Sequence, residues 1–420
     1  MEQVGDLAGF SCAEELPMES WQGTNLPRVG GFNRAVVLDA IRQHGEISRV
    51  ELAQKTGLTA QTMSNIVRAL MDEGLVTENG RAPSTGGKRR VLLKIAPNSY
   101  SAIGLHLDPG VITGVLLDLA GTVRVRSRRR LPREATPNTV LNALHRTYQQ
   151  LVRRSAVDPG RVLGVGLAVP GPIDTARRQV LSPPGLPGWA DVALADALQQ
   201  RIELNVVLDN DATAAAIGER WAGGAQRAGS FVYVYLGSGV GAGLVLGDRV
   251  HRGVTNNAGE IGHLNGGGNR QCRCGRKGCL DAYCSIPAML ADWWAAGGDS
   301  REQSPERAYD QFARRAAAGD TAALRVLRQA ATRLGQSLAG LVGLLDVDRI
   351  VLGGPALRHV AGLVVERVAK VLRANAPAWE VRPVQVQTAL IGEDAGAVGA
   401  ASLVLDHTYS PRLATLLGQN

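Results

Sequence analysis

The sequence contains little cysteine and has no long apolar run, and its N-terminal segment lacks basic residues. Five of the 420 residues are Cys, which is too few for a disulfide framework and favours a reducing compartment. No run of about 18 apolar residues occurs, so no membrane-spanning helix is expected. Residues 1–27 carry five acids, no Lys or Arg and no apolar core, and so do not form a secretory signal. These absences predict a cytoplasmic protein that does not insert into a membrane.

The length and the charge of the chain predict several domains, one of them basic. A chain of 420 residues with 45% hydrophobic content can form two or three domains around a large core. The formal net charge of +8 is uneven, because residues 28–95 carry 11 basic and six acidic side chains in a short stretch. A nucleic-acid contact fits such a segment, although an ordinary solvated face would have the same composition.

The distribution of apolar, basic and turn-forming residues divides the chain into three segments. Residues 1–31 have scattered Gly and Pro and no sustained apolar period, which predicts a disordered tail. Residues 32–96 are expected to form a first domain that includes most of the basic segment. Residues 97–420 are expected to form a larger second domain.

Residues 32–96 show the pattern of a winged helix-turn-helix. Residues 32–43 place apolar side chains on one helical face, and Ser48-x-x-Glu51 is a capping box that opens a second helix over 49–55. Thr59 caps a third helix that continues to about residue 72. The apolar side chains of this third helix recur at helical spacing: Met63, Ile66, Val67 and Leu70.

The third helix and a basic loop are the candidate DNA contacts. Strands are predicted over 75–77 and 91–93, and the loop between them is basic and contains two Gly, as a wing does. The helix would enter the major groove while the wing contacts the phosphate backbone. The candidate DNA-binding residues are Gln61, Thr62, Ser64, Asn65, Arg68, Lys88, Arg89 and Arg90. The alternative is a small helical interaction module.

Residues 97–420 alternate strands and helices, which indicates an α/β domain. The expected strands are 102–107, 113–118, 162–169, 205–208, 231–236 and 349–352, and the expected helices are 287–296, 321–345 and 395–405. The helix over 321–345 is rich in Ala and Leu and could serve as a dimer face. Residues 124–133 contain six Arg, which we expect on a solvated strand and turn, with a second DNA contact as the alternative.

One His and three Cys lie within 17 positions and form a candidate metal site. The residues are His263, Cys272, Cys274 and Cys279, with the spacing H-x8-C-x-C-x4-C. One imidazole and three thiolates complete a tetrahedral set for Zn²⁺ and leave no position for water, so a structural zinc is predicted. Gly275 and Gly278 allow the tight turns that this convergence needs. The alternative is a loop of reduced or disulfide-paired Cys.

Carboxylates accompany this segment and also follow a predicted strand. Glu260 and Asp281 flank the metal ligands, so folding around the metal would bring them towards one place. Asp211 stands after the strand over 205–208 and before a helix, where a carboxylate can accept protons from hydroxyl groups. A plain helix cap is the alternative for Asp211.

The segment from Gly259 to Asp281 resembles the signature of the ROK family (repressors, open reading frames, kinases). Two further segments agree: residues 209–213, Asp-Asn-Asp-Ala-Thr, resemble the family's E-N-D-A-N, and residues 237–241 resemble its glycine-rich phosphate loop. The resemblance covers roughly residues 32–405 and is greatest to ROK transcriptional regulators. It implies an α/β chain with an N-terminal winged helix-turn-helix, then a two-lobed actin-like ATPase (ROK sugar kinase) fold with a structural zinc loop.

The resemblance also implies a sugar site and a cofactor. The residues that would face the sugar are Asn210, Asp211, Glu260, His263 and Asp281. Asp211 corresponds to the general base of the kinases, and Asp281 replaces a Glu that is one methylene longer. His263 would bind zinc through one ring nitrogen and sugar through the other. One structural Zn²⁺ per chain is expected.

The first phosphate loop departs from the pattern of the kinases. In the family register, residues 103–111 place His106 at the Asp of D-x-G-G-T-K, and Asp108 and Pro109 at its two glycines. A carboxylate repels phosphate and Pro removes a backbone N–H donor, so we expect no enzymatic activity. Residues 183–189 resemble a P-N-L-P-G-W segment, but Gly185 stands where the family has a sugar-binding Asn.

The sequence therefore predicts a DNA-binding, carbohydrate-responsive regulator of the repressor type. Its partners would be operator DNA and a sugar or sugar derivative that alters operator affinity. A homodimer or higher homo-oligomer would suit an operator with two half-sites. Two alternatives remain: a sugar kinase with a fused DNA-binding domain, and a regulator whose ligand is another protein.

Overall fold

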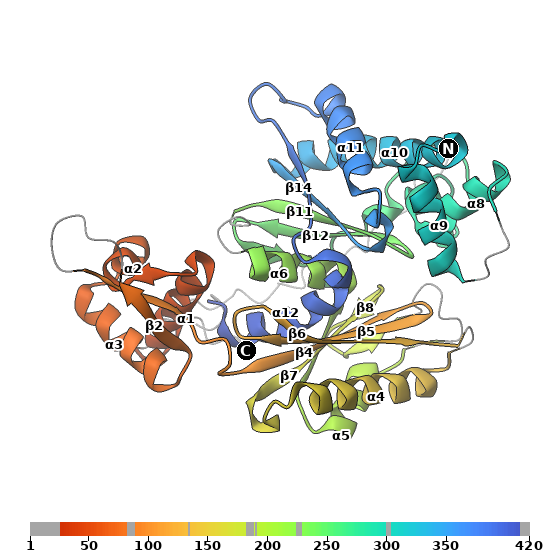
Figure 1. The fold of residues 1–420 in the computed structure, drawn as a ribbon. Coiled ribbons are helices and arrows are strands. Elements are labelled where there is room, and N and C mark those ends of the chain that lie inside the picture. The colour runs from red at the N-terminus through yellow and green to blue at the C-terminus, as the bar shows by residue number, and fades with distance from the viewer. Residues whose placement is uncertain are drawn as a thin grey trace, which may run out of the picture.

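The computed structural model describes residues 26–81, 89–132, 135–181, 189, 191–223, 229–299 and 304–411 (Figure 1). A winged helix-turn-helix at the N-terminus is followed by two lobes, each built on a five-stranded sheet. Among these residues, no helix has the length and apolar character that crossing a membrane requires.

The winged helix-turn-helix packs three helices on a small antiparallel sheet. The helices are α1 (Leu26–His44), α2 (Arg49–Thr56) and α3 (Ala60–Asp72). The strands, in the order β1-β3-β2, are β1 (Ile47–Ser48), β2 (Val76–Arg81) and β3 (Val91–Ile95). Ser48 and Glu51 form the expected capping box, and Thr59 caps α3 through the N–H of Thr62. Met63, Val67 and Leu70 are buried, whereas Ile66 is only partly covered.

The first helix begins earlier than the sequence suggested. The predicted disordered tail extended to residue 31, but residues 26–31 belong to α1, so this part of the prediction is wrong. The Gly30–Gly31 pair favoured a break, since each interior Gly costs a helix about 1 kcal/mol relative to Ala. Pro27, by contrast, suits the first turn of a helix because its missing N–H has no partner there. Residues 1–25 lie outside the described part of the chain.

Lobe one is built on a mixed sheet of order β10-β7-β4-β5-β6. Its strands are β4 (Ser101–Asp108), β5 (Val111–Asp118), β6 (Val123–Arg130), β7 (Val162–Val169) and β10 (Val206–Asn210). Helices α4 (Pro137–Ser155) and α5 (Leu194–Ile202) cover its outer face (Figure 1). A separate hairpin joins β8 (Ile173–Asp174) to β9 (Gln179–Val180). The strands expected over 102–107 and 113–118 are present as β4 and β5, which pair as an antiparallel hairpin.

Three of the five arginines of β6 are exposed and pair with carboxylates. Arg124 pairs with Asp118 at 2.7 Å. Arg126 pairs with Asp394 and Arg128 with Glu306, both at 2.9 Å. These three pairs agree with the expected solvated strand, because the carboxylates offset charge that would otherwise attract phosphate.

Lobe two is built on a second sheet of order β13-β12-β11-β14-β15. Its strands are β11 (Phe231–Leu236), β12 (Val240–Leu246), β13 (Arg249–His251), β14 (Arg349–Gly353) and β15 (Gln385–Thr388). The helices on its outer side are α7 (Asp281–Cys284), α8 (Ile286–Ala295), α9 (Pro305–Ala317), α10 (Thr321–Leu345) and α11 (Ala361–Asn375) (Figure 1). One apolar cluster runs through these helices and the sheet.

Two helices fill the space between the sheets. Helix α12 (Ala395–Tyr409) packs on the sheet of lobe one, and α6 (Asp211–Gly223) packs on the sheet of lobe two (Figure 1). Their contacts are close enough to require glycine. A methyl group added at Gly166 would lie 1.7 Å from the Ala400 carbonyl oxygen, and one at Gly399 would lie 2.2 Å from that of Ala214. The lobes therefore meet through a layer of small residues.

Candidate functional site

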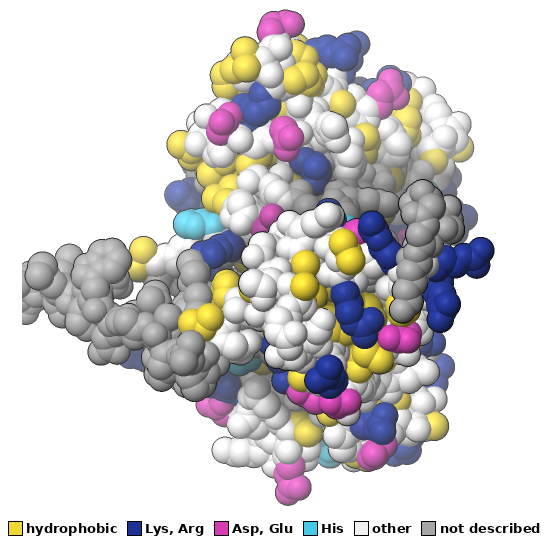
Figure 2. Space-filling model, turned by 90° about the vertical axis from the view of Figure 1, so that its left-hand side faces the viewer, with side chains coloured by type: hydrophobic (Ala, Val, Ile, Leu, Met, Phe, Trp, Pro, Cys, Tyr) yellow, Lys and Arg dark blue, Asp and Glu magenta, His cyan; other side chains and the backbone are white. Residues whose placement is uncertain are grey.

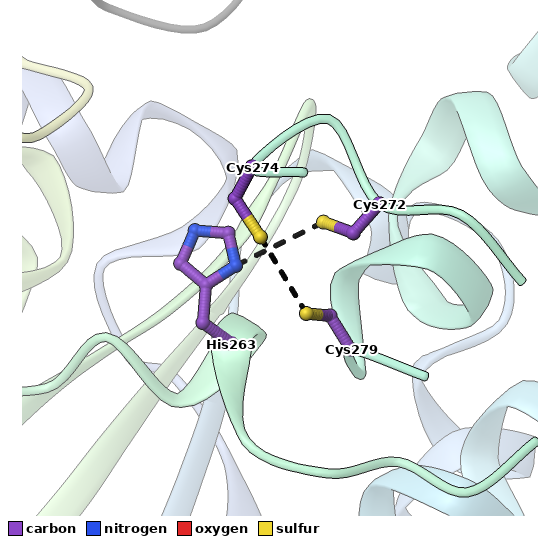
Figure 3. A group of neighbouring side chains, drawn as sticks. All are labelled: His263, Cys272, Cys274 and Cys279. Atoms are coloured by element: carbon purple, nitrogen blue, oxygen red, sulfur yellow. Dashed lines mark hydrogen bonds between the residues drawn. The ribbon is translucent and has the colours of Figure 1, made fainter. Parts of the chain in front are cut away.

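The four predicted metal ligands converge. The donor atoms of His263, Cys272, Cys274 and Cys279 all lie within 4.8 Å of one another (Figure 3). The Sγ atoms of Cys274 and Cys279 are 3.6 Å apart, and His263 Nδ1 is 3.9 Å from Cys272 Sγ. Ligands about 2.3 Å from a tetrahedral zinc would be separated by about 3.8 Å, so this spacing fits the ion. All three Cys are free, since a disulfide would bring two sulfurs to about 2.05 Å.

A tight knuckle of backbone presents the thiols. Cys272 N–H donates to the Arg276 carbonyl at 2.8 Å, and Gly275 and Gly278 take φ values of 86° and 78°. Hydrogen bonds from the backbone and side chain of Arg276 lower the pKa of Cys274 to about 7. Burial raises the pKa of Cys279 to about 11. A bound cation favours the thiolate at both positions, because metal coordination deprotonates a thiol.

A cavity of about 320 Å³ lies beside the metal ligands and has several charged and polar side chains in its wall. The five residues expected to face a sugar all line it: Asn210, Asp211, Glu260, His263 and Asp281. Asn210 ends β10 and Asp211 begins α6, while Glu260 precedes the short 3-10 helix Ile261–His263. The Nδ1 atom of His263 faces the thiols, and its other ring nitrogen points away from them (Figure 3). One imidazole can thus serve the metal and the cavity together.

Asn210, rather than Asp211, takes the larger part in capping α6. The Asn210 side-chain oxygen accepts the N–H groups of Ala212 at 2.9 Å and Thr213 at 3.4 Å. Asp211 Oδ1 accepts the Ala212 N–H, and its Oδ2 lies 3.9 Å from His106 Nε2. That second oxygen faces His106, and Asp211 lines the cavity, so the carboxylate is placed to accept a hydrogen bond from a ligand hydroxyl.

The other two carboxylates, of Asp281 and Glu260, differ in their hydrogen bonds and in their burial. Asp281 Oδ1 accepts the Val240 N–H at 3.0 Å, and Oδ2 lies 3.4 Å from an Arg273 nitrogen. Its short side chain is therefore already held by the loop around it. Burial raises the pKa of Glu260, because a charged carboxylate is poorly solvated in the cavity wall.

His106 is a neighbour of Asp211 that sequence reasoning missed. Its side chain is buried, and Nε2 has no hydrogen-bond partner among the described residues. Burial alone would lower the pKa of His106, but the nearby Asp211 and Asp108 raise it above its usual value. The two residues are 105 positions apart in sequence, and only the pairing of β4 with β7 and of β7 with β10 brings them together. No local pattern could have revealed this contact.

The two glycine-containing loops are joined by a side-chain hydrogen bond. Ser238 Oγ, in the loop between β11 and β12, donates to Asp108 Oδ1 at 2.6 Å. Burial raises the pKa of Asp108. The segment over 183–188 lies outside the described residues. Trp189, which follows it, is buried and donates its ring N–H to the Ala135 carbonyl at 3.1 Å.

The predicted DNA-binding residues differ in how available they are. Gln61, Asn65 and Arg68 are exposed on α3. Thr62 is engaged with the Thr59 hydroxyl, and Ser64 donates to the Ala60 carbonyl at 2.8 Å, so these two have less to offer a base. Arg89 and Arg90 are exposed before β3, whereas Lys88 lies outside the described residues. Figure 2, which views this end of the molecule, shows Lys and Arg side chains on the outward face.

Comparisons with known proteins agree with both halves of the chain. A model of the ROK family matches residues 103–407, and a model of winged helix-turn-helix DNA-binding domains matches residues 36–77. The xylose repressor of Bacillus subtilis is 27% identical over 383 residues, covering 89% of this chain and 95% of that protein. The DNA-binding transcriptional dual regulator NagC of Escherichia coli is 26% identical and covers 84% of this chain and 89% of that one.

Solved structures show the same architecture. A ROK family transcriptional regulator described as a homolog of the E. coli MLC protein superposes with a TM-score of 0.74 at 24% identity. It covers 93% of this chain and the whole of that one. A ROK glucokinase from Streptomyces griseus, in complex with glucose and AMPPNP, superposes with a TM-score of 0.63 at 28% identity. It covers 72% of this chain and 98% of the kinase. The regulator covers the larger part of the present chain.

Proposed function

The chain belongs to the ROK family, and we propose that it is a DNA-binding transcriptional repressor whose operator affinity is altered by a sugar or sugar derivative. One observation carries this proposal: a single chain joins a helix with exposed polar side chains and the exposed Arg89 and Arg90 to a cavity lined by an amide and three carboxylates. Amides and carboxylates are groups that hold sugar hydroxyls in place. The xylose and N-acetylglucosamine repressors among its relatives support a carbohydrate effector.

The winged helix-turn-helix supplies the DNA contacts in this proposal. Helix α3 would lie in the major groove, where Gln61 and Asn65 can pair with base edges and Arg68 with guanine or phosphate. Arg89 and Arg90 would contact the backbone beside it. An operator with two half-sites would be matched by a homodimer, in which each subunit presents one α3.

Two substitutions separate base recognition from backbone contact. Gln61→Ala should reduce affinity for the operator by about 1–3 kcal/mol and leave binding to unrelated duplex unchanged, because it removes a base contact. Arg89→Ala should weaken binding to both duplexes and lower the slope of log K against log salt by about one. Fluorescence anisotropy over a range of salt measures both effects.

The control for this pair is Arg373→Ala, which removes an exposed arginine from the last turn of α11 in lobe two. It changes net charge as Arg89→Ala does but lies outside the winged helix-turn-helix. Equal losses in the Arg89 and Arg373 variants would show that general charge, and not the wing, determines binding.

The sugar would bind in the cavity beside the metal ligands. Asn210 and Asp211 come from lobe one and the start of α6, whereas Glu260, His263 and Asp281 come from lobe two. A ligand held by both groups favours one angle between the lobes. Its effect on DNA cannot exceed its differential affinity for the two states, typically about 1–3 kcal/mol. A melting-temperature screen with xylose, N-acetylglucosamine and their phosphate esters would identify the effector, because a ligand of the native state raises the melting temperature.

Phosphoryl transfer is the second candidate, because the chain also resembles a glucokinase. The hydrogen bond from Ser238 to Asp108 argues against it, since it places a carboxylate between the two loops that would enclose phosphate. Pro109 in addition offers no N–H donor. Positioning and charge neutralisation supply most of the catalysis of phosphoryl transfer, and an acid in the loop opposes both.

We therefore expect no ATP-dependent phosphorylation of any sugar that raises the melting temperature. The assay couples ADP formation to NADH oxidation at saturating sugar and ATP, with a ROK glucokinase as the positive control. Turnover by the purified protein that is lost in Asp211→Asn would establish the kinase and remove the sensor-only interpretation.

A further inference from the structure

Helix α6 links the cavity to the DNA-binding domain. Its first residue is Asp211, in the cavity wall, and it continues for 13 residues to Gly223. At 1.5 Å per residue this is about 20 Å of rigid helix. Figure 1 shows α6 between the two sheets, and α1 of the winged helix-turn-helix lies near one end of this layer. A contact between α1 and the C-terminal end of α6 would therefore respond to a displacement of its N-terminal end in the cavity wall.

Arg42, in the last turn of α1, makes this contact. Its Nη1 donates to the carbonyl oxygens of Trp221 at 2.6 Å and of Arg220 at 3.3 Å. Its guanidinium also lies over the Trp221 ring, 4.5 Å from the centroid. The last carbonyls of a helix have no partner within it and carry partial negative charge, so a cation there binds favourably. Arg42 thus caps α6 from another domain.

A cluster of four buried charged side chains holds the Arg42 guanidinium in this orientation. Asp39 accepts from Arg42 Nε at 3.0 Å and from Nη2 at 2.7 Å, and it lies 3.7 Å from Arg220. Arg220 in turn donates to Asp406 at 3.1 Å. The exposed fractions of these four side chains lie between 4% and 14%. Desolvation offsets much of the attraction within a buried ion pair, whereas removing one partner leaves an uncompensated buried charge.

This cluster receives side chains from three helices, two from α1 and one each from α6 and α12. Asp39 and Arg42 belong to α1, Arg220 to α6 and Asp406 to α12. Helix α6 packs on the sheet of lobe two and α12 on the sheet of lobe one, so a change in the angle between the lobes alters the spacing of Arg220 and Asp406. The winged helix-turn-helix contacts Arg220 of this pair through Asp39 and Arg42 of α1, so a change in the spacing of the pair would alter the position of the domain.

We propose that Arg42 is the positioning residue through which occupancy of the cavity reaches the DNA-binding helices. The inference rests on the proposed function and adds the route by which the two sites communicate. When the lobes change angle, the end of α6 moves relative to α12, and Arg42 carries α1 with it. Helix α3 packs against α1, so its orientation in the groove changes too.

The surrounding contacts should keep the domain attached when Arg42 is replaced. Leu38, Ile95, Leu119, Trp221 and Tyr409 line a small apolar space at the same junction. The core of the winged helix-turn-helix is continuous with apolar residues of β5 and α12. Apolar contact has little directional preference, so it holds the domain in place without setting its angle.

The experiment compares Arg42→Gln with wild type and with Arg34→Gln in the full-length protein. Arg34 is on the same helix but pairs with Glu73 inside the winged helix-turn-helix, so it is the matched control. Operator affinity is measured by anisotropy with and without the sugar that gives the largest rise in melting temperature. Sugar affinity is measured by calorimetry with and without operator.

In wild type and Arg34→Gln we expect sugar to change operator affinity, within the range of about 5- to 150-fold that is common for coupled sites. In Arg42→Gln the change should fall to less than about twofold while sugar affinity stays within about threefold. Because coupling is reciprocal, operator should also cease to alter sugar affinity in this variant. Sugar and operator should thus each still bind, but neither should change the affinity for the other. This result would show that the coupling between the two sites is lost while both sites remain intact.

A full sugar response in Arg42→Gln would overturn the inference and leave the proposed function intact. A wild-type protein that binds operator but responds to no sugar would overturn the proposed function itself, and this inference with it. Should Arg42→Gln fail to fold, Asp406→Asn decides the question from the side of α12. It keeps Arg42 and must still reduce the response, and an unchanged response there overturns the inference.

Discussion

Cys274→Ser should lose the bound metal and lower the melting temperature by roughly 10 °C or more. Structural zinc contributes about 10–16 kcal/mol to the folding of small zinc-finger peptides, and even a fraction of this is several kcal/mol here. Cys274 is exposed, so the substitution leaves no cavity and the effect comes from the lost ligand. Elemental analysis of protein purified without chelator, together with thermal melting, measures both quantities.

Cys284→Ser is the matched control for this change. Cys284 is also free, but it is buried on α7 and its Sγ contacts the Ala330 carbonyl at 3.3 Å, away from the four candidate ligands. This variant should keep one zinc per chain. Full zinc occupancy in Cys274→Ser, or no zinc in wild type, would contradict the metal assignment.

Loss of the metal should also abolish sugar binding. His263 is both a candidate ligand and part of the cavity wall, and Glu260 and Asp281 lie on the same segment of chain. Releasing the knuckle releases these side chains as well. Chelator-treated protein should therefore show no sugar-dependent rise in melting temperature, and added Zn²⁺ should restore it.

Asp211→Asn should weaken sugar binding by about 10- to 100-fold, which corresponds to the roughly 1.5–3 kcal/mol of one hydrogen bond to a charged group. The carboxylate lies at the start of α6 in the cavity wall, with Oδ2 near His106, and an amide would present an NH₂ group or a weaker acceptor there. Operator affinity without sugar should change little, because Asp211 is not among the DNA-contacting residues.

Asp348→Asn is the control for this change, since Asp348 is exposed in lobe two just before β14 and does not line the cavity. Calorimetry with the effector sugar and anisotropy with operator are the two measurements. A sugar affinity in Asp211→Asn within about threefold of wild type would show that the carboxylate does not bind the ligand.

Elements with a local signal could be predicted from the sequence. Ser48 and Glu51 stand at capping spacing, and the structure has the capping box. The four metal ligands are within 17 positions, so their convergence needed only two tight turns. Helix α4 was not predicted, although the sequence carries a local signal for it. Thr136 caps the helix, Pro137 occupies its first turn and its buried residues recur at helical spacing.

Contacts between distant segments could not be predicted from the sequence. The bond from Arg42 to Trp221 joins residues 179 apart, and that from Ser238 to Asp108 joins residues 130 apart. Each depends on how sheets and helices pack after they form, and no periodicity or cap encodes it. The family resemblance placed Asp211 and Glu260 together and put His106 in the first phosphate loop, but it did not predict the contact of His106 with Asp211 or the junction at α1.

The glycines between the lobes bear on how genetic data for this protein are to be interpreted. Gly166 and Gly399 face carbonyl oxygens so closely that alanine would force α12 away from its neighbours. Neither residue lines the cavity beside the metal ligands or belongs to the winged helix-turn-helix. A random-mutagenesis screen for constitutive expression will recover alleles at such positions together with alleles of true ligand residues. Phenotype alone does not separate the two classes, whereas the distance of each glycine to the facing backbone does.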